Sequence, residues 1–263
     1  MGIVTVLYLV LWSTMIYYFQ NTTTTHGMGD QFKPYATQMI SQMGFQFSSM
    51  IMALLTIMLG AGAISSEAET GLIHGILARP IHRFEYILGK FAGLVIMASI
   101  YATILYSLLL CIGSLFGLST ISSLTFSQIM LGWFLYLLIP VAVLCLTFYG
   151  SVSLKTVPNG ILMIFIYILG NVGGMVEMIG RFINNTAVSG VGIFISLISP
   201  FHTLYNTMER TLLPSTTISN LAMGGPLSGS GAPASMWMYL YIGIYMVGFV
   251  LLAIRKFSRK DII

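Results

Sequence analysis

Residues 91–154 read FAGLVIMASIYATILYSLLLCIGSLFGLSTISSLTFSQIMLGWFLYLLIPVAVLCLTFYGSVSL, a run of 64 residues without Asp, Glu, Lys or Arg. A helix that crosses a bilayer needs about 20 apolar residues, so this run has room for two crossings and a turn. The whole chain of 263 residues is similar, with 57% apolar residues, 7% charged residues and a mean hydropathy of +0.91. So few charges cannot solvate a soluble enzyme of this size, and so much apolar surface excludes a disordered chain.

The long uncharged, apolar segments of this chain predict an all-α, polytopic membrane protein with a single transmembrane domain over 1–263. Strands of a membrane barrel would alternate polar and apolar residues, and these segments do not. Six spans are expected at about 2–20, 43–65, 91–115, 128–154, 159–179 and 235–254. Residues 181–234 are expected to hold an outer region with short re-entrant helices, because Gly190–Ser199 is apolar but too short to cross and Pro200 closes it.

The basic residues indicate which ends of the spans face the cytoplasm. One set of loops carries eight of them: Arg79, Arg83, Lys90, Lys155, Arg255, Lys256, Arg259 and Lys260. The other set carries three: Lys33, Arg181 and Arg210. Because Lys and Arg concentrate in cytoplasmic loops, both termini are expected in the cytoplasm of a multi-pass protein of the cell membrane, with a prokaryotic host. The net charge of +4 follows from this topology, and no basic patch with interleaved aromatic residues suggests a nucleic-acid partner.

The sequence shows no set of residues that would catalyse a reaction or hold a cofactor. Motifs for a zinc protease, a serine hydrolase elbow and a phosphate-binding loop are missing. His74 and His82 do not make a metal site, because zinc needs three or four ligands in a defined geometry. If this chain moves a solute uphill, the energy must therefore come from a partner.

Polar residues concentrate between the second and third spans, in SSEAETGLIHGILARPIHRFEYILGK at 65–90. Ser66 and Glu69 have the spacing of a capping box, and Arg79 suits the carboxyl end of a helix. Pro80 then stops the helix, because it disfavours helical backbone in the preceding residue. The pattern predicts a short amphipathic helix over 67–79 on the cytoplasmic face. Its composition leaves two interpretations open: a helix on lipid headgroups, or one that docks in a groove of a cytoplasmic partner.

This loop resembles the membrane subunit of type 2 ABC exporters. The resemblance lies in Glu-x-Glu-x-Gly, Leu-Ala-x-Pro-Ile-x-Arg and a Gly-Lys pair at the start of the third span, and it extends to the six-span architecture and the basic tail. In that family the loop is a coupling helix that seats in a cleft of the ATP-binding subunit. His74 is no hallmark of the family but lies on the same helix. The residues expected to couple to the ATP-binding subunit are Glu67, Glu69, Gly71, His74, Leu77, Arg79, Pro80, Arg83 and Lys90.

The resemblance also implies partners and a mechanism. Two copies of an ATP-binding subunit would bind ATP and Mg²⁺, and their closure would push on the helix 67–79. A second membrane subunit, identical or similar, would contact Gly170 and Gly174, because small residues four apart let helices approach closely. The nearly uncharged spans favour an amphiphile, peptide, lipid or drug over a metal ion as cargo. The alternative is a membrane scaffold or sensor that transports nothing and recruits a cytoplasmic ATPase.

Overall fold

The computed structural model describes residues 2–25, 33–72, 83–118, 121, 124–212 and 236–258, and within these ranges it contains no strand. Its helices are α1 (Gly2–Thr25), α2 (Lys33–Ala61), α3 (Ser65–Glu69), α5 (Arg83–Leu115), α7 (Phe126–Ser153), α8 (Thr156–Phe182), α9 (Thr186–Ile198), α10 (Phe201–Leu212) and α12 (Met236–Ser258). Six helical segments are long and apolar enough to cross a membrane. The prediction of an all-α, polytopic membrane protein is therefore confirmed.

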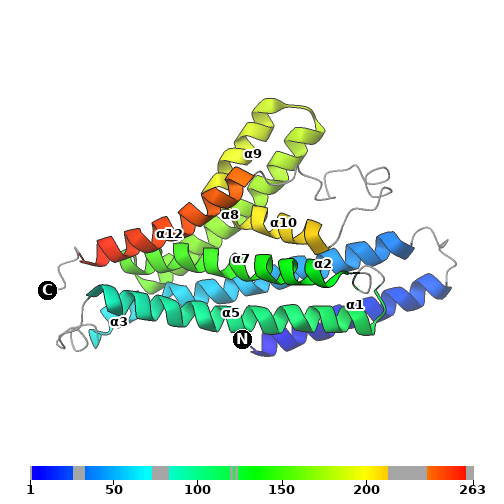
Figure 1. The fold of residues 1–263 in the computed structure, drawn as a ribbon, viewed down its shortest axis with the longest axis horizontal. Coiled ribbons are helices and arrows are strands. Elements are labelled where there is room, and N and C mark those ends of the chain that lie inside the picture. Colours follow the sequence, from blue (N-terminus) through cyan, green and yellow to red (C-terminus); the bar gives the residue numbers. More distant parts are fainter. Residues whose placement is uncertain are drawn as a thin grey trace.

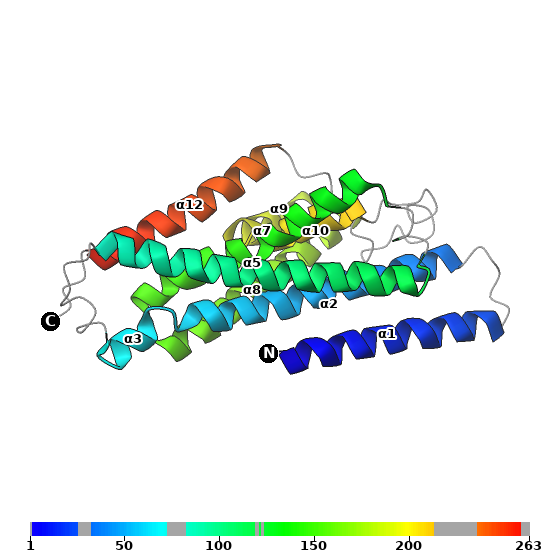
Figure 2. The same ribbon diagram turned by 60° about the horizontal axis from the view of Figure 1, so that its bottom comes forward.

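Helix α7 lies at the centre of the bundle, with α2, α5, α8, α10 and α12 packed around it. It is apolar on all sides, which is typical of a buried helix, and its buried face runs from Gly132 to Val152. Helices α2, α5 and α7 run lengthwise beside one another (Figure 1). The short helix α3 lies at one end of this bundle, which we call the α3 end (Figures 1 and 2).

Helix α1 is attached along one side of α2 and is otherwise largely exposed. The indole Nε1 of Trp12 donates to the carbonyl oxygen of Ile40 at 3.2 Å, and the Tyr8 hydroxyl donates to that of Gly44. A glycine is required at 44, because a Cβ there would lie 2.4 Å from the Trp12 ring. The outward side chains of α1 are apolar, as expected for a helix that contacts lipid.

Helix α9 folds back on α8, and this hairpin rises away from the other helices at the top of Figure 1. The Asn185 side chain caps α9 by accepting from the backbone N–H of Ala187 at 3.0 Å. Helix α10 follows after a bend of 99°, so that the pair has the form of a broken span or a re-entrant loop. The rest of the outer region predicted over 181–234 falls at 213–235, outside the described residues.

Several helices extend beyond the predicted spans. Helix α2 begins at Lys33 rather than 43, and α5 begins at Arg83 rather than 91. The prediction limited each span to its apolar stretch, but a helix continues through polar and charged residues where it leaves the apolar layer. In contrast, α2 ends at Ala61, and a turn at 62–64 separates it from α3, whereas the predicted span ran to 65.

Candidate functional site

Three helix ends meet at the α3 end of the bundle: the carboxyl end of α2 and the amino ends of α3 and α8. Backbone groups at helix ends have no partner within their own helix and need one elsewhere. Here each of the three ends is bonded by a side chain from another helix. We give the name end-capping junction to five residues that take part in these bonds: Ser65, Glu69, Ser151, Thr156 and Asn159.

Ser151 of α7 caps the amino end of α3. Its Oγ accepts from the backbone N–H of Ile64 at 2.9 Å and of Ser65 at 3.1 Å, and its side chain is buried. The N-cap residue of α3 is Ile64, which has no side-chain acceptor of its own. Ser151 therefore supplies from α7 the acceptor that an N-cap serine or aspartate normally supplies locally.

Asn159 of α8 joins the end of α2 to α7. Its Nδ2 donates to the carbonyl oxygens of Ala61 and Thr147, each at 3.1 Å, and the residue is fully buried. Helix α7 approaches so closely that a Cβ on Gly150 would lie 2.0 Å from the Asn159 Oδ1. One buried amide thus holds α2, α7 and α8 together.

Glu69 of α3 caps the amino end of α8. Its Oε1 accepts from the backbone N–H of Thr156, the first residue of α8, at 2.8 Å. A negative charge at this position also complements the positive end of the helix dipole. The Thr156 hydroxyl lies 2.9 Å from the Ser65 Oγ, which adds a second bond between α3 and α8.

Glu67, two residues earlier on α3, reaches α5. Its Oε1 lies 2.5 Å from the Lys90 Nζ, and its Oε2 accepts from the Tyr86 hydroxyl. Lys90 and Tyr86 are one helical turn apart on α5, so both face the same carboxylate. The Tyr86 ring stacks on Phe257 of α12, with centroids 6.1 Å apart. Glu67 therefore connects α3 to α5 and, through Tyr86, to the last turn of α12.

The helix predicted over 67–79 is interrupted in its described part, and residues 73–79 of that prediction lie outside the described residues. Helix α3 covers only Ser65–Glu69, and a turn follows in which Gly71 has a φ of +74°, a backbone conformation that favours glycine. The predicted capping box is also wrong, because the Ser66 Oγ donates to the carbonyl oxygen of Gly62 and Glu69 bonds to α8 instead. The exposed N–H groups at the amino end of α8 offer Glu69 a partner that local sequence could not reveal.

Only some of the predicted coupling residues can be placed. The structure pairs Glu67 with Lys90 and places Glu69 in the end-capping junction, and Gly71 lies in the turn after α3. Arg83 begins α5, but its side chain is outside the described part of the chain. His74, Leu77, Arg79 and Pro80 also lie outside the described residues.

Gly170 and Gly174 pack against their own chain. A Cβ on Gly174 would lie 1.8 Å from the His202 Cδ2, and one on Gly170 would lie 2.1 Å from the Ser199 Oγ. The corner between α9 and α10 therefore fills this face of α8, which corrects the expectation that it contacts a second membrane subunit. Burial lowers the pKa of the His202 imidazole to about 4, so the ring that covers Gly174 is neutral at pH 7.

Four residues were not predicted from the sequence: Glu209 on α10, and Ser151, Thr156 and Asn159 of the end-capping junction. Burial raises the pKa of the Glu209 carboxyl to about 7, although the neighbouring Arg210 opposes this rise. The apolar residues of α10 recur at helical spacing, which could have predicted an amphipathic helix that brings Glu209 against the bundle. Asn159 lies near the start of an apolar span, and a polar residue in that position could have indicated a bond to another helix.

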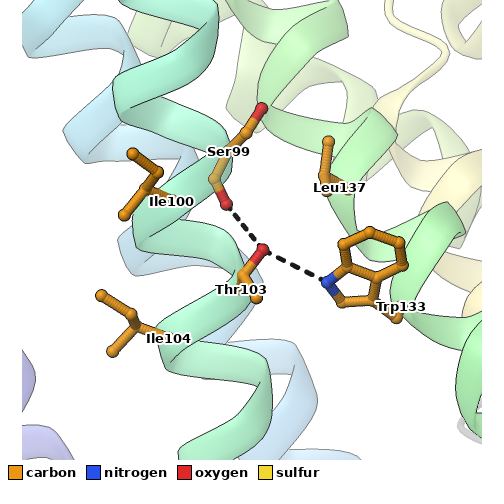
Figure 3. A pocket seen from close by; sticks show the side chains of 6 residues that line it. All are labelled: Ser99, Ile100, Thr103, Ile104, Trp133 and Leu137. Atoms are coloured by element: carbon orange, nitrogen blue, oxygen red, sulfur yellow. Dashed lines mark hydrogen bonds between the residues drawn. The ribbon is translucent and has the colours of Figure 1, made fainter.

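A shallow, open pocket of about 300 Å³ lies between α5 and α7 (Figure 3). It is lined by Ser99, Ile100, Thr103, Ile104, Trp133 and Leu137. The Trp133 Nε1 donates to the Thr103 Oγ1 at 3.2 Å, and that hydroxyl donates to the Ser99 carbonyl oxygen at 2.9 Å. These polar groups bond to one another between apolar walls. Within the described ranges, no group of three His, Cys, Asp or Glu residues could hold a metal ion.

A family model described as "ABC-2 family transporter protein" matches residues 2–262. No curated protein matches this chain. The matched range covers nearly the whole sequence, including all six spans and the end-capping junction.

Proposed function

Because the chain belongs to the ABC-2 transporter family, we propose that it forms the substrate pathway of an ATP-driven exporter and couples to a separate ATP-binding subunit. The family and the six spanning helices make it a multi-pass membrane protein and a permease subunit. ATP and Mg²⁺ would bind to the partner, present in two copies, and a second membrane subunit, identical or similar, would complete the pathway.

The orientation that we propose places the α3 end in the cytoplasm of a prokaryotic cell. The described basic residues support it: Arg83 begins α5, Lys155 precedes α8, and Arg255 and Lys256 end α12. These helix ends lie together with α3 (Figure 1). At the opposite end, Lys33 begins α2 and Arg210 lies in the last turn of α10. The excess of Lys and Arg at the α3 end is typical of a cytoplasmic face.

The end-capping junction is the single observation that supports coupling best. The segment 70–82 joins α3 to α5, and in our proposal it is the part that meets the ATP-binding subunit. A force on this segment would reach α5 through the chain itself and α2, α7 and α8 through the bonds of α3, since the Ser65 Oγ donates to the Ala61 carbonyl oxygen of α2 at 2.9 Å. ATP-driven closure of the partner would thus move four spans together.

Neutral polar groups bond to one another between the described spans, and they support an amphiphilic or apolar cargo rather than a metal ion. The Ser48 Oγ and the Tyr136 hydroxyl are 2.5 Å apart, as are the Thr5 Oγ1 and the Tyr101 hydroxyl. Hydroxyls and phenols bond neutral polar groups but do not neutralise an ion. We therefore propose an amphiphile, peptide, lipid or drug as cargo.

Affinity purification in a gentle detergent, followed by mass spectrometry, tests the coupling. The expected result is a stoichiometric soluble chain with a phosphate-binding loop, and ATP hydrolysis by the purified complex. Size-exclusion chromatography would confirm that the membrane chain is intact. An intact membrane chain that brings no such partner would contradict the proposal.

A further inference from the structure

We propose that Glu67 and Glu69 are internal positioning residues that connect α3 to α5 and α8, and that neither carboxylate contacts the ATP-binding subunit. The inference rests on the proposed function, since it concerns how the coupling segment is held. The resemblance to the exporter family assigned both residues to the partner. The structure gives each of them an intramolecular partner instead.

The amino end of α8 lacks an acceptor of its own. The first turn of α8 has no acidic residue. Lys155 precedes α8, and its carbonyl oxygen accepts the first helical bond, from Asn159 N at 3.0 Å. The side chain of Lys155 can only donate, so it cannot cap the helix. Pro158 has no N–H, so the donors of this turn that precede Asn159 are those of Thr156 and Val157. Glu69 supplies an anionic acceptor to the first of these at 2.8 Å.

Glu67 is engaged at both carboxylate oxygens. Oε1 pairs with the Lys90 Nζ at 2.5 Å, and Oε2 accepts from the Tyr86 hydroxyl. The ammonium group also lies 5.6 Å from the centre of the Tyr86 ring, a distance typical of a cation–π contact. The carboxylate of Glu67 is therefore already paired with a cation of its own chain, Lys90 on α5, and needs none from the ATP-binding subunit.

Together the two carboxylates make α3 a link between α5 and α8. Glu67 binds α5, Glu69 binds α8, and Ser151 of α7 bonds the amino end of α3. The contact with the ATP-binding subunit then falls to the segment after α3, at 70–82. A movement of that segment would pull on α5 and α8 at once, and α8 leads to the α8–α9 hairpin at the far end.

Neutral substitutions separate a helix cap from a salt bridge to a partner. Glu69→Gln keeps an oxygen that accepts from Thr156 N–H, whereas Glu69→Ala removes it. Thr156→Pro removes the donor at a position where helices tolerate proline, and Thr156→Val is its control because it keeps the N–H. The readouts are the melting temperature of the purified chain alone and the amount of ATP-binding subunit that the chain captures.

We expect Glu69→Ala and Thr156→Pro each to lower the melting temperature by about 2–4 °C, and the double variant to lower it no further. Glu69→Gln keeps the acceptor and loses only the charge, so its melting temperature should fall less than that of Glu69→Ala, and it should capture the ATP-binding subunit at the wild-type level. If the two losses in melting temperature added up in the double variant, the proposal that Glu69 caps α8 would be wrong. A loss of capture in Glu69→Gln of about tenfold or more, at a melting temperature above that of Glu69→Ala, would also overturn the proposal, since that result would place the carboxylate on the partner.

A charge exchange tests Glu67 in the same assays. Glu67→Lys and Lys90→Glu should each lower the melting temperature and the capture, and the double variant should recover both. Failure of the double variant to recover either readout would overturn the internal ion pair. If the wild-type chain captures no ATP-binding subunit, the proposed function fails, while the melting temperatures still decide whether the two carboxylates act within the chain.

Discussion

Asn159 shows how much one side chain contributes to this junction. It is fully buried, and its amide N–H groups bond two carbonyl oxygens on two other helices. Loss of a buried donor leaves its acceptors unsatisfied, which costs about 1–3 kcal/mol. A single amide is therefore expected to determine how firmly α8 is held against α2 and α7.

Replacement of Asn159 by Ala should lower the free energy of unfolding by about 1–3 kcal/mol, which corresponds to a lower melting temperature in detergent. Asn171→Ala is the matched control, because the Asn171 amide bonds Tyr167 of its own helix, with its Nδ2 3.0 Å from the Tyr167 carbonyl oxygen. Equal losses in the two variants would show that the inter-helix bonds of Asn159 contribute nothing specific.

Gly174 should not tolerate even a methyl group. A Cβ there would lie 1.8 Å from the His202 ring, so Gly174→Ala must displace the α9–α10 corner, at a cost of about 1–3 kcal/mol. Gly160→Ala on the same helix is the control, since its Cβ would meet Ala61 at an ordinary 3.7 Å. The combination of Gly174→Ala with His202→Ala should recover stability, and a double variant as unstable as Gly174→Ala would refute this packing.

The carboxyl group of Glu209 should make the stability of the folded chain depend on pH. Burial raises the pKa of its carboxyl from 4.5 to about 7, so the folded chain favours the protonated form. The stability that this group contributes is complete below pH 4.5 and is lost as the pH rises through 7. The melting temperature should therefore fall less between pH 5 and pH 8 in Glu209→Gln than in the wild type. An equal fall in both proteins would contradict this assignment.

Helices were easier to predict than their ends. The apolar runs predicted six spans, because a lipid-facing helix must be apolar over its whole length. The sequence near Glu69 predicted a local capping box, but the carboxylate bonds to Thr156, which is 87 residues away in the chain. A local pattern cannot reveal such a partner, since the packing of α3, α7 and α8 decides which helix end is nearest.

Ser151 offers a test of how α3 is held. Ser151→Ala leaves the backbone N–H groups of Ile64 and Ser65 without their acceptor, so hydrogen exchange at these two amides should speed up. Ser153→Ala is the control, because the Ser153 Oγ bonds only the Tyr149 carbonyl oxygen of its own helix, at 3.2 Å. Unchanged exchange at both amides in Ser151→Ala would mean that α3 is held by other contacts.

The two ends of the whole molecule differ in charge and in structure. The α3 end holds the end-capping junction and the basic ends of α5, α8 and α12, whereas the α8–α9 hairpin rises away from the other helices (Figure 1). The distribution of charge predicted this polarity from the sequence alone. The corner that covers Gly170 and Gly174 was not predictable, because short spacings of glycine fit a contact within one chain as well as one between subunits.

Site-directed photocross-linking in the cells that express the protein tests the central claim most directly. A photoreactive amino acid at Leu77 lies in the segment proposed to meet the ATP-binding subunit, and one at Ala187 on α9 is the control at the opposite end. We predict a cross-link from Leu77, but none from Ala187, to a soluble chain with a phosphate-binding loop. The absence of that product from Leu77, or an equal yield from Ala187, would contradict coupling at the α3 end.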